Sequence, residues 1–123
     1  LLGTKKGKEL IDYYKNADVF ILTSDYEGMP LTILEAMATG TPIISSDIKG
    51  VREFIGSDGI LIKHSLPKIF AREIIKLIED KELRKYFSKK GRKKAEQYSW
   101  DKIVKQTEEV YKEVLNQNDP PKH

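Results

Sequence analysis

The chain has 123 residues, of which 39% are hydrophobic and 33% are charged, and its formal net charge is +3. This length predicts one domain, and the apolar fraction suffices for a packed core, which excludes a wholly disordered chain. The absence of cysteine excludes disulfide frameworks, Cys-ligated zinc and thiol nucleophiles. No apolar run approaches the roughly 18 residues of a membrane-spanning helix, and no signal peptide is visible, so we expect a cytoplasmic protein.

Short apolar runs in the first half of the chain predict strands. Ala17–Thr23 and Thr41–Ser45 are nearly continuous apolar runs, as is typical of strands covered on both faces of a parallel sheet. Gly59–Ile62 predicts a third strand, and Leu1–Leu2 is consistent with the end of a fourth.

Helical patterns separate these strands. Lys8–Asn16 carries apolar residues at helical spacing, and Pro30–Thr39 begins with proline and is followed by glycine. Gly50–Ile55 predicts a short helix before the third strand. Strands that alternate with helices in this way predict right-handed βαβ units and a parallel sheet.

From Leu66 onward, helical patterns replace the strands. Ser99 is the expected N-cap of a last helix, and Trp100 at its start is the expected core anchor. A break in the helices is expected near Gly91. The apolar positions before that break form two stripes, one of Ile69, Ile74, Leu77 and Ile78 and one of Leu83, Tyr86 and Phe87.

We therefore expect one Rossmann-like α/β domain over residues 1–115, with an α/β part at 1–65 and a helical part at 66–115. Residues 116–123 are expected to form a flexible tail. Three or four strands are too few for a doubly wound sheet, which has about five or six. Because the strand Ala17–Thr23 would expose an open edge, we expect this chain to be part of a larger α/β domain or one half of a two-chain assembly.

The stretch Ser24–Pro42 is the segment most suited to carry chemistry. It follows a buried strand and opens a helix, at the sheet edge where parallel α/β proteins bind ligands. Gly28 permits close approach of the backbone to a ligand, and Pro30 suits the first helical position. The helix start would present the open amides of Leu31, Thr32 and Ile33. Such amides bind anions, and diphosphate is the ligand we expect.

Two carboxylates flank this helix start. Seven residues lie between Glu27, in the loop, and Glu35, which is three and four positions beyond Thr32 and Leu31 on the helix. At that position Glu35 could accept hydrogen bonds from the vicinal hydroxyls of a ribose, and Glu27 could bind hydroxyls of a second sugar. The alternative is that Glu27 is a solvated loop acid and that Glu35 pairs with a lysine on the helix surface.

Three other features of the sequence could indicate a different function: a pair of acids, a basic segment and a histidine. Asp25 and Glu27 have a spacing that could hold Mg²⁺ beside a diphosphate, but the helix start already supplies a positive field, so we expect no metal. Lys81–Lys94 contains eight basic residues against the single acid Glu82, which would suit anionic lipid or nucleic acid. A solvated helix surface explains the same charges. His64 has no catalytic partner nearby and is expected to be a loop residue.

Residues 27–44, EGMPLTILEAMATGTPII, resemble the donor-site signature of glycosyltransferase family 4, which contains retaining transferases of the GT-B type. The flanking segments NADVFILTS, SDIKGVREFI, DGILI and YSWDKI are also similar to the C-terminal donor-binding domain of that family. The resemblance covers nearly the whole chain. It implies the parallel-sheet, Rossmann-like half of a GT-B C-terminal domain, with three to four strands followed by a helical segment.

This resemblance also implies a function. The chain would be the donor-binding part of a metal-independent hexosyltransferase that moves a sugar from a UDP-, GDP- or ADP-sugar to an acceptor hydroxyl, with no cofactor and no general base. Glu27 would be the catalytic residue that contacts the transferred sugar, and Glu35 would bind the ribose. The residues expected to bind the donor sugar and diphosphate are Glu27, Gly28, Met29, Pro30, Leu31 and Thr32.

Members of this family also have an acceptor domain and further strands, one of which precedes an Arg/Lys pair that binds the diphosphate. These parts would lie upstream of Leu1, so we expect the isolated chain to be inactive. One alternative is a non-catalytic subunit of a split transferase that needs a partner chain. Another is a basic module that binds nucleic acid or a membrane surface. The partners we favour are the nucleotide sugar and the missing domain or chain, with peripheral membrane contact and no nucleic acid.

Overall fold

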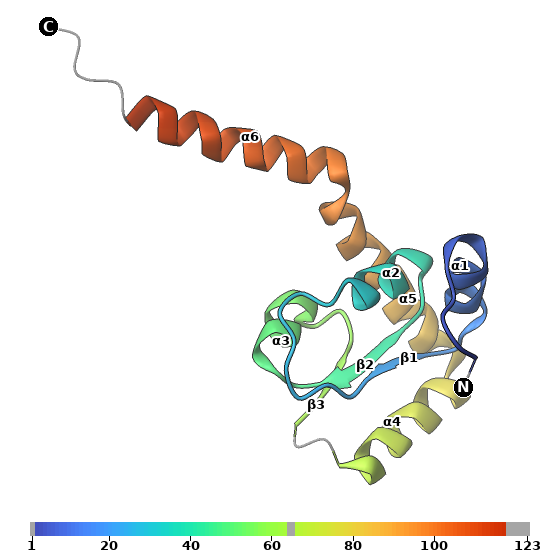
Figure 1. Cartoon of the computed structure of the whole chain (residues 1–123). Coiled ribbons are helices and arrows are strands. Elements are labelled where there is room, and N and C mark those ends of the chain that lie inside the picture. Colours follow the sequence, from blue (N-terminus) through green and yellow to red (C-terminus); the bar gives the residue numbers. More distant parts are fainter. Residues whose placement is uncertain (1, 64–65, 118–123) are drawn as a thin grey trace, which may run out of the picture.

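The computed structural model describes residues 2–63 and 66–117 (Figure 1). Its sheet contains β1 (Phe20–Leu22), β2 (Ile43–Ser46) and β3 (Ile60–Ile62), in the order β1-β2-β3. Both pairs of neighbouring strands are parallel. One helix lies in each crossover between consecutive strands, so the prediction of a parallel α/β sheet built from βαβ units is confirmed.

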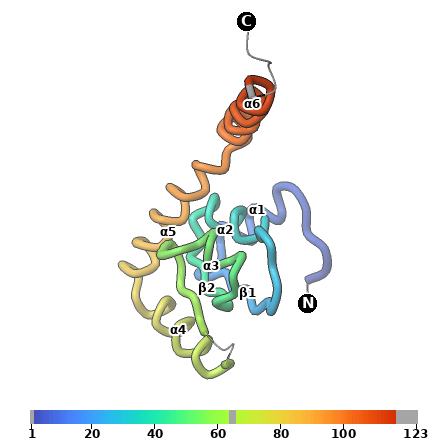
Figure 2. Tube along the Cα trace, turned by 90° about the vertical axis from the view of Figure 1, so that its left-hand side faces the viewer, coloured from blue at the N-terminus to red at the C-terminus, as the bar shows by residue number. Residues whose placement is uncertain are grey.

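The helices cover both faces of this sheet. Figure 2 shows α1 and α4 on opposite sides of the strands. The described helices are α1 (Gly7–Asn16), α2 (Leu31–Thr39), α3 (Lys49–Ile55), α4 (Pro67–Glu79), α5 (Lys81–Ala95), the short 3-10 helix η1 (Glu96–Tyr98) and α6 (Trp100–Gln117).

Local chemistry explains several helix boundaries. Gly40 ends α2 in the left-handed conformation at φ 82°, a backbone geometry that glycine adopts without strain. Asp80 begins α5, because its carboxylate accepts a hydrogen bond from the amide of Leu83 at 2.8 Å. A glycine after a helix and an aspartate before one are both residue types that mark helix ends in a sequence.

Two apolar clusters form the core, one on each face of the sheet. Ile43 of β2 packs with α2 and α3, including the fully buried Met37 and Ile55. Its neighbour Ile44 faces the opposite cluster, which contains Leu77 of α4. All residues of β2 are buried because it is the central strand.

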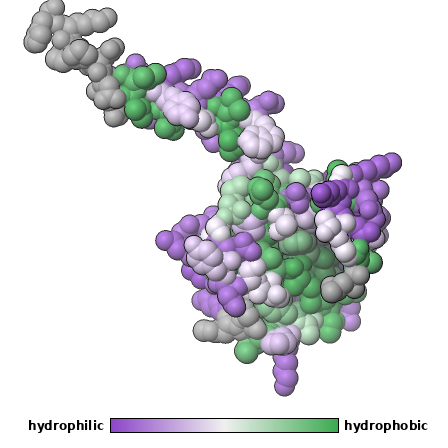
Figure 3. All heavy atoms as spheres, in the orientation of Figure 1, coloured by the Kyte–Doolittle hydropathy of each residue, from purple (hydrophilic) through white to green (hydrophobic). Residues whose placement is uncertain are grey.

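The edge strand β1 is less covered than its apolar sequence predicted. Phe20 and Leu22 pack against the cluster formed by α1, α2 and α3. Ile21 points to the other face and is 39% exposed. The expectation of burial on both faces is therefore wrong for β1, since none of its three residues is buried. Figure 3 shows apolar surface over this region of the molecule.

Helix α6 projects away from the rest of the chain (Figure 1). Trp100 is 82% exposed, so the expectation of a core anchor is wrong. Val110, Tyr111 and Leu115 are also exposed, and α6 presents this apolar stripe to solvent (Figure 3). Within residues 2–63 and 66–117, no helix is long and apolar enough to span a bilayer.

Other differences from the sequence predictions are local. Of the two apolar stripes expected before Gly91, Ile78 and Tyr86 are 52% and 54% exposed, so these two positions do not pack into the core. Helix α5 does not break at Gly91, which is buried against α2. Leu2 is not part of a strand. Helix α6 includes residues 116 and 117, whereas Leu1, His64 and residues 118–123 lie outside the described residues.

Candidate functional site

The loop between β1 and α2 carries most of the predicted site residues. It leaves the carboxyl end of β1 and passes beside α3 before it enters α2 (Figure 1). Gly28, Met29, Leu31 and Thr32 are exposed, whereas Pro30 is buried. The loop therefore presents its backbone and the start of α2 to solvent at the ligand-binding edge of a parallel sheet.

Helix α2 starts one residue later than predicted. Pro30 has extended geometry (φ −74°, ψ 109°) and is the N-cap, not the first helical residue. Its carbonyl oxygen accepts hydrogen bonds from the amides of Ile33 at 3.1 Å and Leu34 at 3.4 Å. The expectation of an open amide at Ile33 is therefore wrong.

The amides of Leu31 and Thr32 remain as the open pair at this helix start. Within the described residues, neither donates to a protein acceptor. Both residues are exposed, so the two N–H groups are accessible to a ligand. Two adjacent amides at the positive end of a helix can bind one anionic oxygen group such as a phosphate.

The first carboxylate, Glu27, is oriented by a residue of its own loop. The Ser24 hydroxyl donates to Oε1 of Glu27 at 2.8 Å, and the Glu27 residue is half-buried. Glu27 is thus a loop acid with one carboxylate oxygen held by a hydrogen bond. No role was expected for Ser24, because a contact between a hydroxyl and a carboxylate of one loop depends on the loop conformation.

The second carboxylate, Glu35, does not pair with a lysine as the alternative interpretation expected. Its Oε2 atom accepts a hydrogen bond from the Tyr14 hydroxyl at 3.0 Å. Glu35 is exposed on α2, whereas Tyr14 is buried in α1 with 9% of its surface accessible. Burial first, and then the hydrogen bond and negative charge of Glu35, raise the pKa of Tyr14 to about 12.

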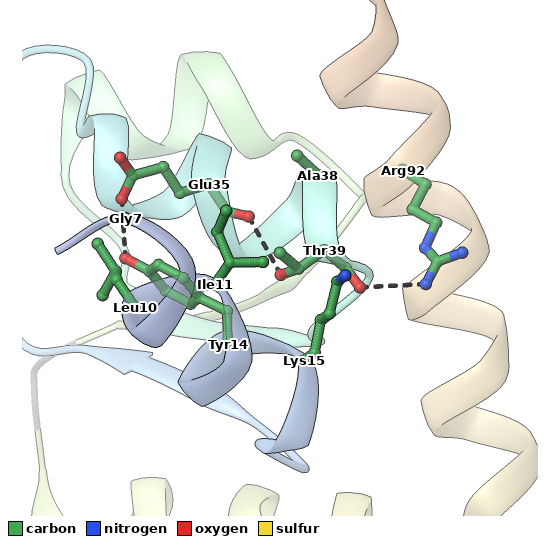
Figure 4. Close-up of a pocket in the computed structure, with 9 residues that line it drawn as sticks. All are labelled: Gly7, Leu10, Ile11, Tyr14, Lys15, Glu35, Ala38, Thr39 and Arg92. Carbon is green, nitrogen blue, oxygen red and sulfur yellow. Dashed lines mark hydrogen bonds between the residues drawn. The ribbon is translucent and has the colours of Figure 1, made fainter. Parts of the chain in front are cut away.

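A groove of about 700 Å³ lies between α1, α2 and α5 (Figure 4). Of the predicted site residues, Glu35 alone lines it, and its carboxylate lies beside the start of α1. The groove thus extends away from the start of α2 on the α1 side. Its lining residues are Gly7, Leu10, Ile11, Tyr14, Lys15, Glu35, Ala38, Thr39 and Arg92.

Gly50 at the start of α3 contacts the candidate site directly. A Cβ atom on Gly50 would overlap the backbone carbonyl oxygens of Glu27 and Gly28. Because Gly50 has no side chain, the start of α3 can pack directly against the backbone of this loop. Sequence places Gly50 in a short helix at the ligand-binding edge of the sheet, but its contact with the Glu27–Gly28 backbone, 22 residues away in sequence, leaves no local signal.

Charged residues that follow β2 pair with each other. Arg52 Nε donates to Oδ1 of Asp47 at 2.5 Å, which joins the turn after β2 to helix α3. Within the described part of the chain, no group of three or more His, Cys, Asp or Glu residues is placed to hold a metal ion.

Half of the basic residues of Lys81–Lys94 bind protein acceptors. Arg84 donates to the carbonyl oxygens of Leu77 at 2.6 Å and of Ile78. Arg92 donates to the carbonyl oxygen of Thr39. Lys85 pairs with Glu82 at 2.7 Å, and Lys90 pairs with Asp58 at 3.1 Å. These contacts favour the interpretation of this segment as a helix surface.

Comparison with known proteins decides the family. A family model described as "Glycosyl transferases group 1" matches residues 1–94, which is more than half of the chain. The chain belongs to this glycosyltransferase family. The expectation of a glycosyltransferase domain is therefore confirmed.

Several relatives of this glycosyltransferase chain share about a third of its residues. An uncharacterized glycosyltransferase of Methanocaldococcus jannaschii is 38% identical over 114 residues, which are 90% of this chain and 29% of the relative. A D-inositol 3-phosphate glycosyltransferase of Streptomyces bingchenggensis is 35% identical over 109 residues, 87% of this chain and 24% of the relative. The chain spans less than a third of the length of these relatives.

The fold agrees with this assignment. Sucrose-phosphate synthase from Thermosynechococcus elongatus is similar to the chain with a TM-score of 0.77 and 28% sequence identity. The similarity covers 86% of this chain and 27% of the synthase. The architecture is thus a Rossmann-like α/β fold of the GT-B glycosyltransferase type.

Proposed function

We propose that this chain is the donor-binding part of a retaining family 4 glycosyltransferase, which moves a hexose from a nucleoside diphosphate sugar to an acceptor hydroxyl. One observation carries the proposal. The start of α2 has two open amides, and the carboxylates of Glu27 before it and Glu35 after it in the chain each accept a hydrogen bond from a hydroxyl group. This arrangement matches a ligand with a central diphosphate and a sugar on each side, which is the chemistry of a nucleotide sugar.

Each part of the site then has one task. The amides of Leu31 and Thr32 stabilise the negative charge that develops on the departing nucleoside diphosphate. Glu27 binds the transferred sugar and holds its anomeric carbon in place, so that catalysis rests on positioning. Glu35 accepts hydrogen bonds from the ribose hydroxyls. Because the helix start supplies the positive field, we propose that transfer needs no metal and no cofactor.

A calorimetric titration of the chain with UDP, GDP, ADP and their sugars tests this proposal. We expect one nucleobase series to bind, and Glu35→Gln to weaken that binding about tenfold, the scale of one lost hydrogen bond to a charged group. Glu79→Gln is the matched control, because Glu79 is an exposed acid on α4. If none of these nucleotides or nucleotide sugars bound while circular dichroism showed a folded chain, the proposal would be overturned.

We propose that the rest of the enzyme corresponds to those parts of the relatives that this chain does not match. The chain spans 24–29% of the length of the relatives described above. The open edge of β1 is a surface that further strands would cover. We propose that an acceptor domain, in the same protein or in a partner chain, completes the active site and that the isolated chain is inactive.

The exposed lysines of α5 suggest where such an enzyme would work. Lys81, Lys89 and Lys93 are exposed on this helix. We propose that this surface permits peripheral contact with anionic lipid from the cytoplasmic side, and that nucleic acid is not a partner.

A further inference from the structure

We propose that Tyr14 is a positioning residue that holds the Glu35 carboxylate in place for the ribose of the donor. This inference rests on the proposed function. The Tyr14 hydroxyl donates to Oε2 of Glu35 at 3.0 Å, across 21 positions of sequence (Figure 4). The hydrogen bond uses one carboxylate oxygen, so the other oxygen remains as an acceptor for a sugar hydroxyl.

Tyr14 is itself held rigidly. Its ring is buried and lies 5.8 Å from the ring of Phe20 in β1. Its backbone carbonyl oxygen accepts hydrogen bonds from the Thr41 hydroxyl at 2.6 Å and from the Ala17 amide at 3.2 Å. The hydroxyl group is therefore presented from a fixed position that three segments of the chain determine.

Glu35 needs such a support because it is an exposed side chain with several rotatable bonds. Within the described residues it forms no ion pair that would restrict it. A carboxylate that is already ordered loses less conformational freedom when ligand binds, which strengthens binding. The Tyr14 hydroxyl is protonated and able to donate at neutral pH, as a tyrosine at its ordinary pKa of 10.0 already would be, and the contact with Glu35 contributes to raising that pKa to about 12.

The chain offers a matched control at the neighbouring position. Tyr13 is 44% exposed, and its ring lies 5.5 Å from Nζ of Lys5, away from the buried face that Tyr14 occupies. Tyr13→Phe and Tyr14→Phe each remove one hydroxyl group and keep the ring. Only the second substitution removes a hydrogen bond to Glu35.

The experiment is a calorimetric titration of wild type and both variants with the nucleoside diphosphate that wild type binds and with its 2′,3′-dideoxy counterpart. We expect Tyr14→Phe to weaken binding of the ribonucleotide about tenfold and to leave binding of the dideoxynucleotide unchanged. Tyr13→Phe should change neither. Equal weakening of both nucleotides, or no weakening, would overturn the role of Tyr14 while the proposed function stands. If wild type binds no nucleotide, the proposed function is overturned, and the role of Tyr14 in donor binding is overturned with it.

A second measurement needs no ligand and applies even if Tyr14→Phe does not fold. Titration of the tyrosine ring by NMR follows the Tyr14 pKa in wild type and in Glu35→Gln. We expect this pKa to fall in Glu35→Gln, because its hydrogen bond to a carboxylate and the nearby negative charge are lost, although burial keeps it above 10.0. An unchanged Tyr14 pKa would overturn the contact on which the inference rests.

Discussion

Single hydroxyl groups orient both acids of the candidate site. Ser24 donates to Glu27 from the same loop, and Tyr14 donates to Glu35 from another helix. Each hydrogen bond occupies one carboxylate oxygen and restricts the direction in which the acid points. The geometry of the candidate site therefore depends on Ser24 and Tyr14 as well as on the two acids.

Gly50 provides a prediction at the same scale. In Gly50→Ala, the new Cβ would overlap backbone oxygens of Glu27 and Gly28, which cannot rotate away as a flexible side chain would. We expect a loss of about 1–3 kcal/mol in the free energy of unfolding, measured by urea denaturation, and weaker nucleotide binding.

Gly28→Ala serves as the stability control for this prediction. A Cβ at Gly28 would meet no atom within 4 Å, so the free energy of unfolding should stay near that of wild type. If Gly50→Ala were as stable as this control and bound nucleotide normally, the support of the loop by α3 would be refuted.

At the scale of elements, the packing of α2 on α5 anchors the helix that carries the site. A Cβ added to Gly91 of α5 would lie 3.4 Å from Cγ of the buried Met37 in α2. Close to the end of α2, Arg92 donates to the carbonyl oxygen of Thr39 at 3.1 Å. The close approach of the two helices therefore depends on a small residue at position 91.

A pair of substitutions at Gly91 tests this packing. Gly91→Ala should fit and should stabilise the chain by up to about 1 kcal/mol, because alanine favours a helix interior. Gly91→Leu should destabilise it by about 1–3 kcal/mol, because the larger side chain must displace Met37. Urea denaturation measures both effects. A chain that tolerates leucine as well as alanine would show that α2 and α5 are not closely packed here.

At the scale of the whole molecule, the sheet has an incompletely covered strand. The strand order leaves β1 at one edge, and Ile21 on that strand is 39% exposed. An open apolar strand edge promotes pairing with another chain. In the described chain, the residues of this strand that face away from α1, α2 and α3 are open to solvent.

Self-association of the isolated chain should therefore depend on β1. We expect Ile21→Lys to weaken self-association about tenfold in sedimentation velocity experiments, because a charge on an edge strand opposes pairing. Ile78→Lys is the control, since Ile78 is 52% exposed but lies on the helix α4. Equal effects of the two substitutions would indicate general apolar association and would contradict a specific role of the β1 edge.

Much of the fold and part of the site could be predicted from sequence. The apolar runs located all three strands within a few residues, and proline and glycine marked both ends of α2. The loop position of Glu27 and the helical position of Glu35 also followed from the expected start of α2. The error at Ile33 arose because the exact helix start decides which amides are bonded, and sequence patterns do not resolve a one-residue shift.

The order of the elements and the segment that carries the candidate site were predictable from sequence, because they depend on local conformational preferences and on residue spacing. The tertiary structure alone decided that Tyr14 supports Glu35, that Gly50 contacts the loop, and that Trp100 is exposed. These outcomes depend on which segments distant in sequence come together. Periodicity identifies an apolar face, but only packing determines whether another element covers it.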